Sequence, residues 1–123
     1  MYQRIIIIGN LGRDPELRYT PAGSPVCNFS VAANRRKNDA DMVVWFKIVA
    51  WGSQAEACNE YLSKGRQVLV EGELLADTDG NPRVYTRNDG TCGASFEVKA
   101  HTVRFLQGGR EQEPGQEDEA LPF

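Results

Sequence analysis

VVWFKIVAW, residues 43–51, is the stretch of this sequence that decides the fold. It is rich in β-branched and aromatic residues and only Lys47 is charged, which is typical of a strand. With the two-residue period of a strand, one face is wholly apolar and comprises Phe46, Ile48 and Ala50. The other face comprises Trp45, Lys47, Val49 and Trp51. We expect the first face to lie in a hydrophobic core and the second to present two indoles around a cation.

Four more segments on both sides of this one show the same period, and turns rich in Gly, Pro, Asn and Asp separate them. They are residues 3–9, 25–36, 67–75 and 95–105. In segment 25–36 the inward positions are Cys27, Phe29, Val31 and Ala33. Segment 3–9 contains four consecutive isoleucines and is apolar on both faces, so we expect its outer face to meet another subunit.

One helix is predicted after the central strand. Residues 53–56, Ser-Gln-Ala-Glu, fit a capping box at its start. The apolar positions recur at helical spacing and are Ala55, Cys58, Tyr61 and Leu62. Lys64 suits the last turn, and Gly65 suits the position that ends the helix. Five strands with a helix between strands 3 and 4 follow the order of an all-β, five-stranded OB-fold barrel.

Two clusters of basic residues are expected at exposed positions of this predicted barrel. The first follows the second strand at a loop mouth and comprises Arg35, Arg36 and Lys37. The second lies in the long connection before the last strand and comprises Arg83, Tyr85 and Arg87. Bases stack on aromatic side chains, and Lys and Arg neutralise phosphates, so these clusters and residues 45–51 favour a groove for single-stranded nucleic acid. The alternatives are that loops or another subunit bury both Trp residues, and that each cluster is an ordinary solvated turn.

The charge pattern divides the chain in two. Residues 1–107 contain 13 Lys and Arg against 12 Asp and Glu, whereas residues 108–123 contain one against five, giving +1 and −4. Residues 107–116 are rich in Gly, Gln and Glu and have no apolar periodicity, which is typical of a disordered tether. We therefore expect one folded domain over residues 1–107 and a disordered acidic tail over residues 108–123.

The end of the tail combines acids with an apolar tip. Its residues are Glu117, Asp118, Glu119, Leu121, Pro122 and Phe123. Leu121 and Phe123 stay in water unless a groove receives them, and Pro122 keeps the tip extended, so we predict that the tip binds partner proteins. A frayed, solvated terminus is the alternative.

Little in the chain favours catalysis, a metal or a cofactor. His101 is the only histidine, so neither a metal cluster nor a nucleophile pair is expected, and a nuclease is the enzymatic alternative. Asp77 and Asp79 begin a stretch like a calcium loop, but Asn88 stands where that loop needs Glu, so a turn is predicted. Three cysteines without close spacing favour reduced thiols in a cytosolic protein, and no signal or membrane segment is predicted.

Several motifs follow one another in a distinctive order. They are GNLGRDPE (9–16), NFSVA (28–32), NRR (34–36), residues 45–52, YLSKG (61–65) and VEG (70–72). In this order the chain resembles the bacterial single-stranded DNA-binding protein (SSB) family over most of residues 3–106. The acidic tail that ends in Pro122 and Phe123 is similar to the C-terminal tip of that family.

The resemblance implies an OB-fold homotetramer that binds single-stranded DNA with little sequence preference and protects it in DNA replication, recombination and repair. It also implies recruitment of replication and repair proteins through the tip, and a cytoplasmic, nucleoid-associated bacterial protein. Base-stacking roles are implied for Trp45 and Trp51, and a third near Tyr85. Lys37 departs from the aromatic residue of many relatives, which exchanges a stacking platform for phosphate attraction. An OB-fold that binds single-stranded RNA, or acts mainly as a protein scaffold, is the alternative, because stacking is indifferent to the sugar.

Overall fold

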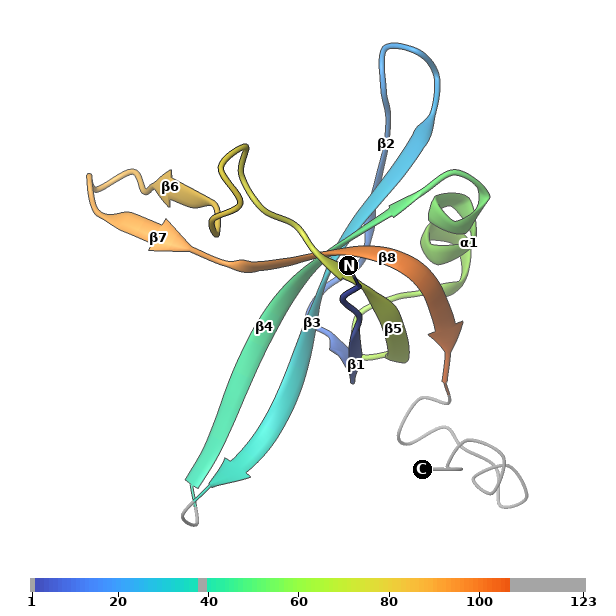
Figure 1. The fold of residues 1–123 in the computed structure, drawn as a ribbon. Coiled ribbons are helices and arrows are strands. Elements are labelled where there is room, and N and C mark those ends of the chain that lie inside the picture. Colours follow the sequence, from blue (N-terminus) through green and yellow to red (C-terminus); the bar gives the residue numbers. More distant parts are fainter. Residues whose placement is uncertain (1, 38–39, 107–123) are drawn as a thin grey trace.

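The computed structural model describes residues 2–37 and 40–106, which form a barrel of long strands with one helix and three short strands (Figure 1). The elements are β1 (Ile5–Leu11), β2 (Glu16–Tyr19), β3 (Pro25–Lys37), β4 (Ala40–Trp51), α1 (Ser53–Tyr61), β5 (Gln67–Leu74), β6 (Val84–Thr86), β7 (Cys92–Ala94) and β8 (Phe96–Phe105). All five strands expected from the sequence are present, with ends that differ by at most three residues.

The main sheet closes on itself. Its strands lie in the order β1-β5-β8-β4-β3-β2, and β1 pairs with β3 as well, which joins the sheet into a barrel. The closing pairs are Asn10 with Ala32 and Leu11 with Val31. Strands β4 and β8 run parallel, whereas the other neighbours are antiparallel. The predicted five-stranded OB-fold barrel is therefore confirmed.

The helix follows the third of the five expected barrel strands, as predicted. This strand is the fourth in the chain, β4, because the structure contains, ahead of it, one strand that was not expected. The additional strand is β2, which pairs with β3 from Glu16 opposite Asn28 to Tyr19 opposite Pro25. A second sheet, separate from the barrel, consists of the β6–β7 hairpin. Asp77 forms the predicted turn ahead of this hairpin, because its Oδ1 accepts the N–H groups of Asp79 and Asn81 at 2.9 and 2.8 Å.

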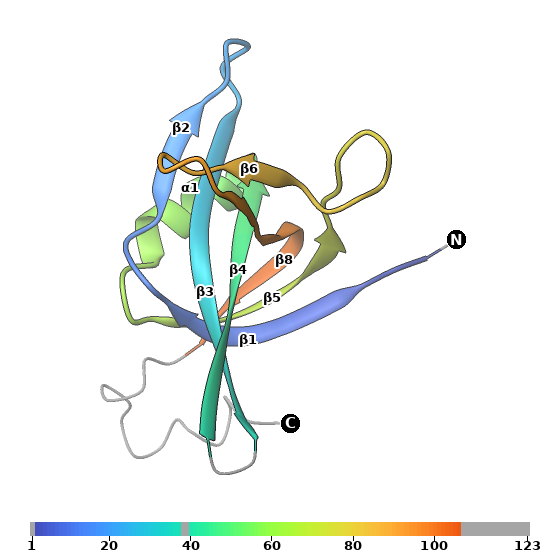
Figure 2. The ribbon, with the colours of Figure 1, turned by 90° about the vertical axis from the view of Figure 1, so that its left-hand side faces the viewer.

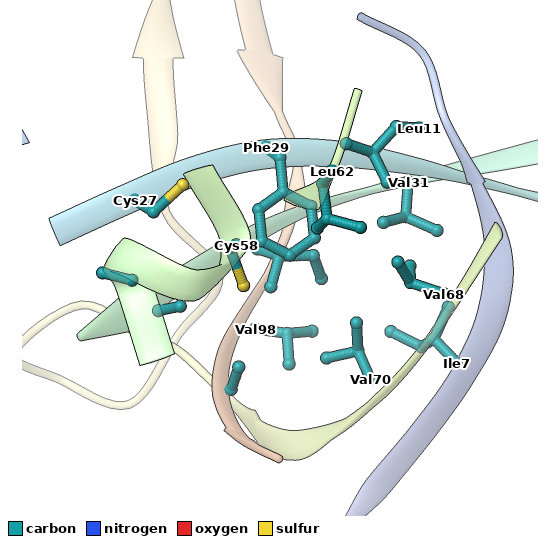
Figure 3. Packing of buried hydrophobic residues seen from close by; sticks show 14 residues of the cluster. Ile7, Leu11, Cys27, Phe29, Val31, Cys58, Leu62, Val68, Val70 and Val98 are labelled. Carbon is teal, nitrogen blue, oxygen red and sulfur yellow. The ribbon is translucent and has the colours of Figure 1, made fainter. Parts of the chain in front are cut away.

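The barrel interior is filled by alternate residues of the strands and by one side of α1 (Figure 3). The buried set includes Cys27, Phe29 and Val31 of β3, and Ile48 and Ala50 of β4. Ala33 and Phe46 are partly buried and pack against this core. The inward faces predicted for both strands are therefore confirmed. Burial of a side chain the size of Val, Ile or Phe contributes about 1.5–3 kcal/mol each, so this cluster accounts for much of the drive to fold.

The start of α1 differs from the predicted capping box. The N-cap is Gly52, with φ of 70°, and no side chain caps the helix. The Gly52 carbonyl accepts the N–H of Ala55 at 2.9 Å, and the Gly52 N–H donates to Pro25 at 3.0 Å. The chain thus leaves β4 through one left-handed glycine, and Ser53 is already helical, one position too late to act as the cap.

The end of α1 also differs from the sequence prediction. The helix ends at Tyr61 because Leu62 is extended and its side chain is buried in the core. Lys64 and Gly65 consequently lie beyond the helix, where Gly65 donates its N–H to the Leu11 carbonyl at 2.9 Å. Tyr61 is exposed rather than part of the buried stripe, and its ring lies 5.8 Å from that of Phe105.

Within residues 2–37 and 40–106, the helix is too short and too polar to cross a membrane. In the same residues, no group of three or more His, Cys, Asp or Glu side chains is arranged to hold a metal ion.

Candidate nucleic-acid interface

The outer face of β4 exposes both tryptophans. The Trp45 side chain is 50% exposed and that of Trp51 is 47% exposed, and Lys47 between them is exposed as well. Among residues 2–37 and 40–106 no loop buries them, so the first alternative does not hold for the part of the subunit that the structure describes. The Trp45 indole lies against Gly12, where an added Cβ would stand 2.6 Å from the ring. Gly12 therefore leaves the space that this indole fills.

Beside Trp45, the side chains of β4 and of the segment from β6 to β8 line a hollow of about 420 Å³, which we call the β4 groove. Its lining includes Ser30, Trp45, Lys47, Tyr85 and Phe96. A second hollow, the β2 hollow, measures about 260 Å³ and is lined by Arg13, Arg18, Asn28, Ser30 and Lys47 among others. Because Ser30 and Lys47 line both, the two hollows form one path across the outer faces of β4, β3 and β2.

The ribbon at β6 passes in front of β3 and β4 in Figure 2. The β6–β7 hairpin brings an aromatic ring and a second cation to this path. The Lys47 Nζ lies 5.2 Å from the centre of the Tyr85 ring, and the Arg87 Cζ lies 5.6 Å from it. Arg87 is fixed by hydrogen bonds to the Cys92 carbonyl and to the Thr91 hydroxyl. Cations at this distance are attracted by the face of a ring, so Tyr85 stands between two positive charges.

The remaining predicted residues lie outside this cluster. Arg83 forms an ion pair with Glu97 at 3.3 Å, which offsets its charge. Trp51 is the last residue of β4, opposite Val26, and six residue steps along the strand place it about 20 Å from Trp45.

The first basic cluster lies on the β3–β4 hairpin, which projects from the barrel (Figure 1). Arg35 is exposed there and pairs through the backbone with Met42, and Arg36 and Lys37 complete the strand opposite Asp41 and Ala40. These three residues form the end of β3. The structure thus brings together Trp45, Lys47, Tyr85 and Arg87, while the hairpin cluster and Trp51 lie farther along the same two strands.

Sequence reasoning did not assign the β2 hollow. Arg13 and Arg18 lie in the connection and short strand ahead of β3, and Arg18 forms an ion pair with Glu16 at 2.9 Å. The alternation of Asn28 and Ser30 with buried residues marks them as outward-facing, which is the one signal for this site in the sequence. Residues 16–19 are too few for their two-residue period to be recognised.

Two of the three cysteines are buried thiols. Burial raises the pKa of the Cys27 thiol to about 11 and that of the Cys58 thiol to about 12. Both groups are therefore protonated and unreactive near neutral pH. They belong to the core rather than to a redox or nucleophilic site, and Cys92 is the exposed one.

Comparison with known proteins places this chain in a family. Residues 2–106 match the model of the single-strand binding protein family. The chain is 51% identical over 106 residues to a single-stranded DNA-binding protein of Treponema pallidum, covering 83% of this chain and 56% of that protein. It is 44% identical over 110 residues to the single-stranded DNA-binding protein of Thermotoga maritima, covering 85% of this chain and 74% of that protein.

A third relative is single-stranded DNA-binding protein 2 of Chlorobaculum tepidum, 39% identical over 121 residues, with 94% of this chain and 76% of that protein covered. The fold is a closed OB barrel with an aromatic and basic outer face, and the chain belongs to the single-strand binding protein family. The predicted tip, residues 117–123, lies outside the described residues.

Proposed function

We propose that this protein binds single-stranded DNA with little sequence preference along the path formed by the β4 groove and the β2 hollow. The observation that carries this proposal is the convergence of Trp45, Lys47 and Tyr85 in one groove, with the Lys47 Nζ 5.2 Å from the Tyr85 ring. The aromatic faces stack on bases and the cations neutralise phosphates. Membership in the family, and the names of the relatives, support DNA as the ligand.

Little sequence preference follows from the chemistry of the path. Every base has a π face, so stacking on Trp45 and Tyr85 in the path, and on Trp51 farther along β4, accepts any of the four bases. A phosphate contact carries no sequence information. The protein acts without catalysis or a cofactor, by covering the single DNA strand. This covering protects single-stranded DNA in replication, recombination and repair, in the cytoplasm of a bacterial cell and at its nucleoid.

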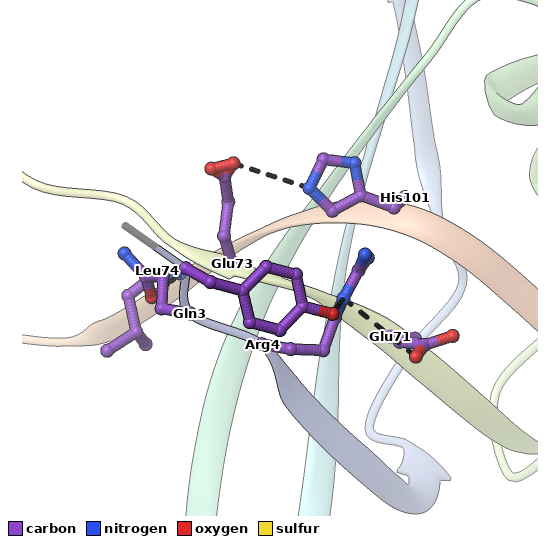
Figure 4. Close-up of polar contacts among 7 residues, drawn as sticks. Gln3, Arg4, Glu71, Glu73, Leu74 and His101 are labelled. Carbon is purple, nitrogen blue, oxygen red and sulfur yellow. Dashed lines mark hydrogen bonds and ion pairs between the residues drawn. The ribbon is translucent and has the colours of Figure 1, made fainter.

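Assembly into a homotetramer is part of the proposal. Ile6 and Ile8 point outward from β1 and are 60% and 39% exposed, whereas Ile7 between them is buried. The ion pair of Arg4 with Glu71 at 3.9 Å and the hydrogen bond between His101 Nε2 and Glu73 Oε2 at 3.3 Å lie on the same side of the sheet (Figure 4). An apolar strip flanked by charges is typical of a surface that another subunit covers.

Recruitment of replication and repair proteins through Leu121, Pro122 and Phe123 is the second part. It is supported by the acidic composition and the apolar end of residues 117–123. Acids beside an aromatic anchor complement a basic rim around an apolar pocket. The tail thus links the DNA-bound domain to other enzymes.

The test is a titration of fluorescently labelled oligo(dT) with the intact protein at several salt concentrations. Trp45→Ala is expected to weaken binding by about 1–3 kcal/mol because one stacked base is lost. Tyr61→Ala is the matched control, since Tyr61 is 55% exposed but lies at the end of α1, outside both hollows. Equal affinity of Trp45→Ala and the parent protein contradicts the proposed path. Oligo(U) that competes as well as oligo(dT) identifies a general single-strand binder of DNA and RNA.

A further inference from the structure

Phe96 is a large exposed aromatic residue at the start of β8. Its side chain is 59% exposed, and its ring centre lies 5.7 Å from that of Phe46. Phe46 with Phe96 is the first pair of the parallel β4–β8 ladder, so β4 has no β8 neighbour from Ala40 to Trp45. The ring therefore stands where the edge of β4 becomes free, supported from one side and open on the other.

Phe96 lines two hollows. It lines the β4 groove together with Trp45, Lys47 and Tyr85. It also lines a hollow of about 270 Å³ whose walls include Leu74, Leu75, Ala76 and Pro82, which we call the Leu74 hollow. Because Ser95 and Phe96 line both, the proposed DNA path is continuous with the Leu74 hollow.

We propose that Phe96 is an additional base-stacking platform, and that the Leu74 hollow receives the nucleobase that stacks on it. This inference rests on the proposed function and extends the DNA path beyond Trp45 and Tyr85. A nucleobase combines an apolar face with a polar edge, which fits a hollow lined by apolar side chains together with Gln3, Ser95 and Glu97.

The charges favour a nucleotide over an apolar peptide in this place. Lys47 lies opposite Glu97 in the ladder, one residue from the Phe46–Phe96 pair, and it also lies over the Tyr85 ring. Glu97 is compensated by Arg83 at 3.3 Å, so the Lys47 ammonium keeps its positive charge for a phosphate. Lys47 then neutralises the phosphate between the base on Tyr85 and the base on Phe96.

The experiment compares Phe96→Ala, Phe96→Leu and Val84→Ala in the full chain, using labelled oligo(dT). The Leu variant keeps apolar contact with Phe46 but removes the aromatic face. Both Phe96 variants are expected to weaken binding, the Ala variant by about 5- to 100-fold, as for the loss of one stacked base. Val84→Ala is the matched control, because Val84 is 67% exposed on the neighbouring β6–β7 hairpin but lines neither hollow, and its affinity is expected to stay within about twofold.

Two further measurements separate stacking from a structural role. Thermal unfolding is expected to be unchanged for Phe96→Leu, so its weaker binding reports the lost ring. Irradiation of an oligo(dT) that contains 5-iododeoxyuridine is expected to cross-link the peptide that carries Phe96, as an iodinated base stacked on the ring requires. If Phe96→Ala does not fold, the DNA affinity of Phe96→Leu and the cross-linked peptide test the stacking role of Phe96.

The outcomes distinguish this inference from the proposed function. If Trp45→Ala weakens binding while both Phe96 variants bind as the parent does, the stacking role of Phe96 is overturned and the DNA path stands. If none of the three weakens binding, the DNA path itself fails. If the Phe96 variants alter the mass measured by light scattering but not the DNA affinity, Phe96 is a contact between subunits and the inference is overturned.

Discussion

Gly12 and Trp45 determine the geometry of the site at the scale of single residues. The indole occupies the space that a Gly12 side chain would take, so the orientation of the stacking platform depends on a residue that has no side chain of its own. Tyr85 and Arg87 lie against Gly93 in the same way, with an added Cβ 2.8 and 2.6 Å from them. In both places a glycine allows a functional side chain to lie close to the backbone.

Gly12→Ala is expected to weaken DNA binding with little effect on folding. The new Cβ would meet the far end of a flexible, half-exposed indole rather than backbone, so Trp45 moves and the barrel stays intact. We expect affinity for oligo(dT) to fall about 3- to 10-fold, and the free energy of unfolding to change by less than about 0.5 kcal/mol. Gly23→Ala, at a glycine with nothing within 4 Å, is the comparison for DNA affinity, although its φ of 91° lowers stability. A Gly12→Ala protein that unfolds more readily but binds DNA normally contradicts this assignment.

The two buried thiols predict a loss of stability in alkali. A thiol ionises near its ordinary pKa of 9.0 in the unfolded chain, whereas burial raises the pKa of Cys27 to about 11 and that of Cys58 to about 12. Between pH 9 and 11 the native state therefore holds more protons than the unfolded state, so the free energy of unfolding falls as the pH rises. Urea unfolding at a series of pH values measures this slope, which is expected to be shallower in Cys58→Ala and unchanged in Cys92→Ser. If the free energy of unfolding falls equally steeply with pH in Cys58→Ala and in the parent protein, ionisation of the buried Cys58 thiol is not the cause.

At the scale of elements, the strands were predictable and their local additions were not. Residues 43–51 alternate strongly enough to assign Phe46 and Ile48 to the core and Trp45 to the outside, and the structure agrees. The ends of α1 depend on tertiary structure instead: Gly52 joins β4 to the helix, and burial of Leu62 ends it. The short strand β2 depends on pairing with β3, which no local pattern reports. Trp45, Lys47 and Tyr85 could be named from the sequence, but their meeting in one groove requires the β6–β7 hairpin to fold over β4.

Removal of the β6–β7 hairpin is expected to leave the barrel folded but weaken DNA binding. The hairpin forms its own sheet, and Val84 pairs with Ala94, so an Asn-Gly turn can replace residues 85–93. Loss of the Tyr85 ring and of Arg87 is expected to lower the affinity for DNA about tenfold or more. The slope of log affinity against log salt concentration is expected to become shallower by about 0.7, because one cation is lost. Binding is measured at several salt concentrations, with Thr86→Ala as the control within the same hairpin. An unchanged salt slope contradicts a phosphate contact at Arg87.

The whole molecule depends on surfaces that one subunit leaves uncovered. Ile6→Lys is expected to reduce the proposed tetramer to smaller species, because it puts a charge in the apolar strip of β1 opposite Glu71. Light scattering at micromolar concentration measures the mass. Tyr19→Lys is the matched control, since Tyr19 is also 60% exposed but lies on β2. A parent protein that is already a stable monomer contradicts the prediction, and the DNA path then ends within one subunit.

The acidic tail is expected to compete with DNA for the same cations. Five acids in residues 108–123 are tethered to a domain whose DNA path includes Lys47 and Arg87, at an effective concentration on the order of millimolar. DNA phosphates displace them, which frees the tip to meet partner proteins. Removal of residues 117–123 is therefore expected to leave DNA affinity unchanged or slightly raised at low salt, and to abolish the binding of replication and repair proteins.

Phe123→Ala separates the anchor from the charge of the tail. An aromatic anchor in a pocket commonly supplies about 2 kcal/mol or more of a small interface, so this variant is expected to lose most partner binding while keeping all five acids and the parent DNA affinity. Ala120→Ser is the matched control at the same end of the chain. Pull-down from a bacterial lysate measures the partners, and DNA titration measures the competition. If the same partners are recovered with and without residues 117–123, neither the anchor nor the acids contribute to an interface with them. The tail then has only an electrostatic effect on DNA binding.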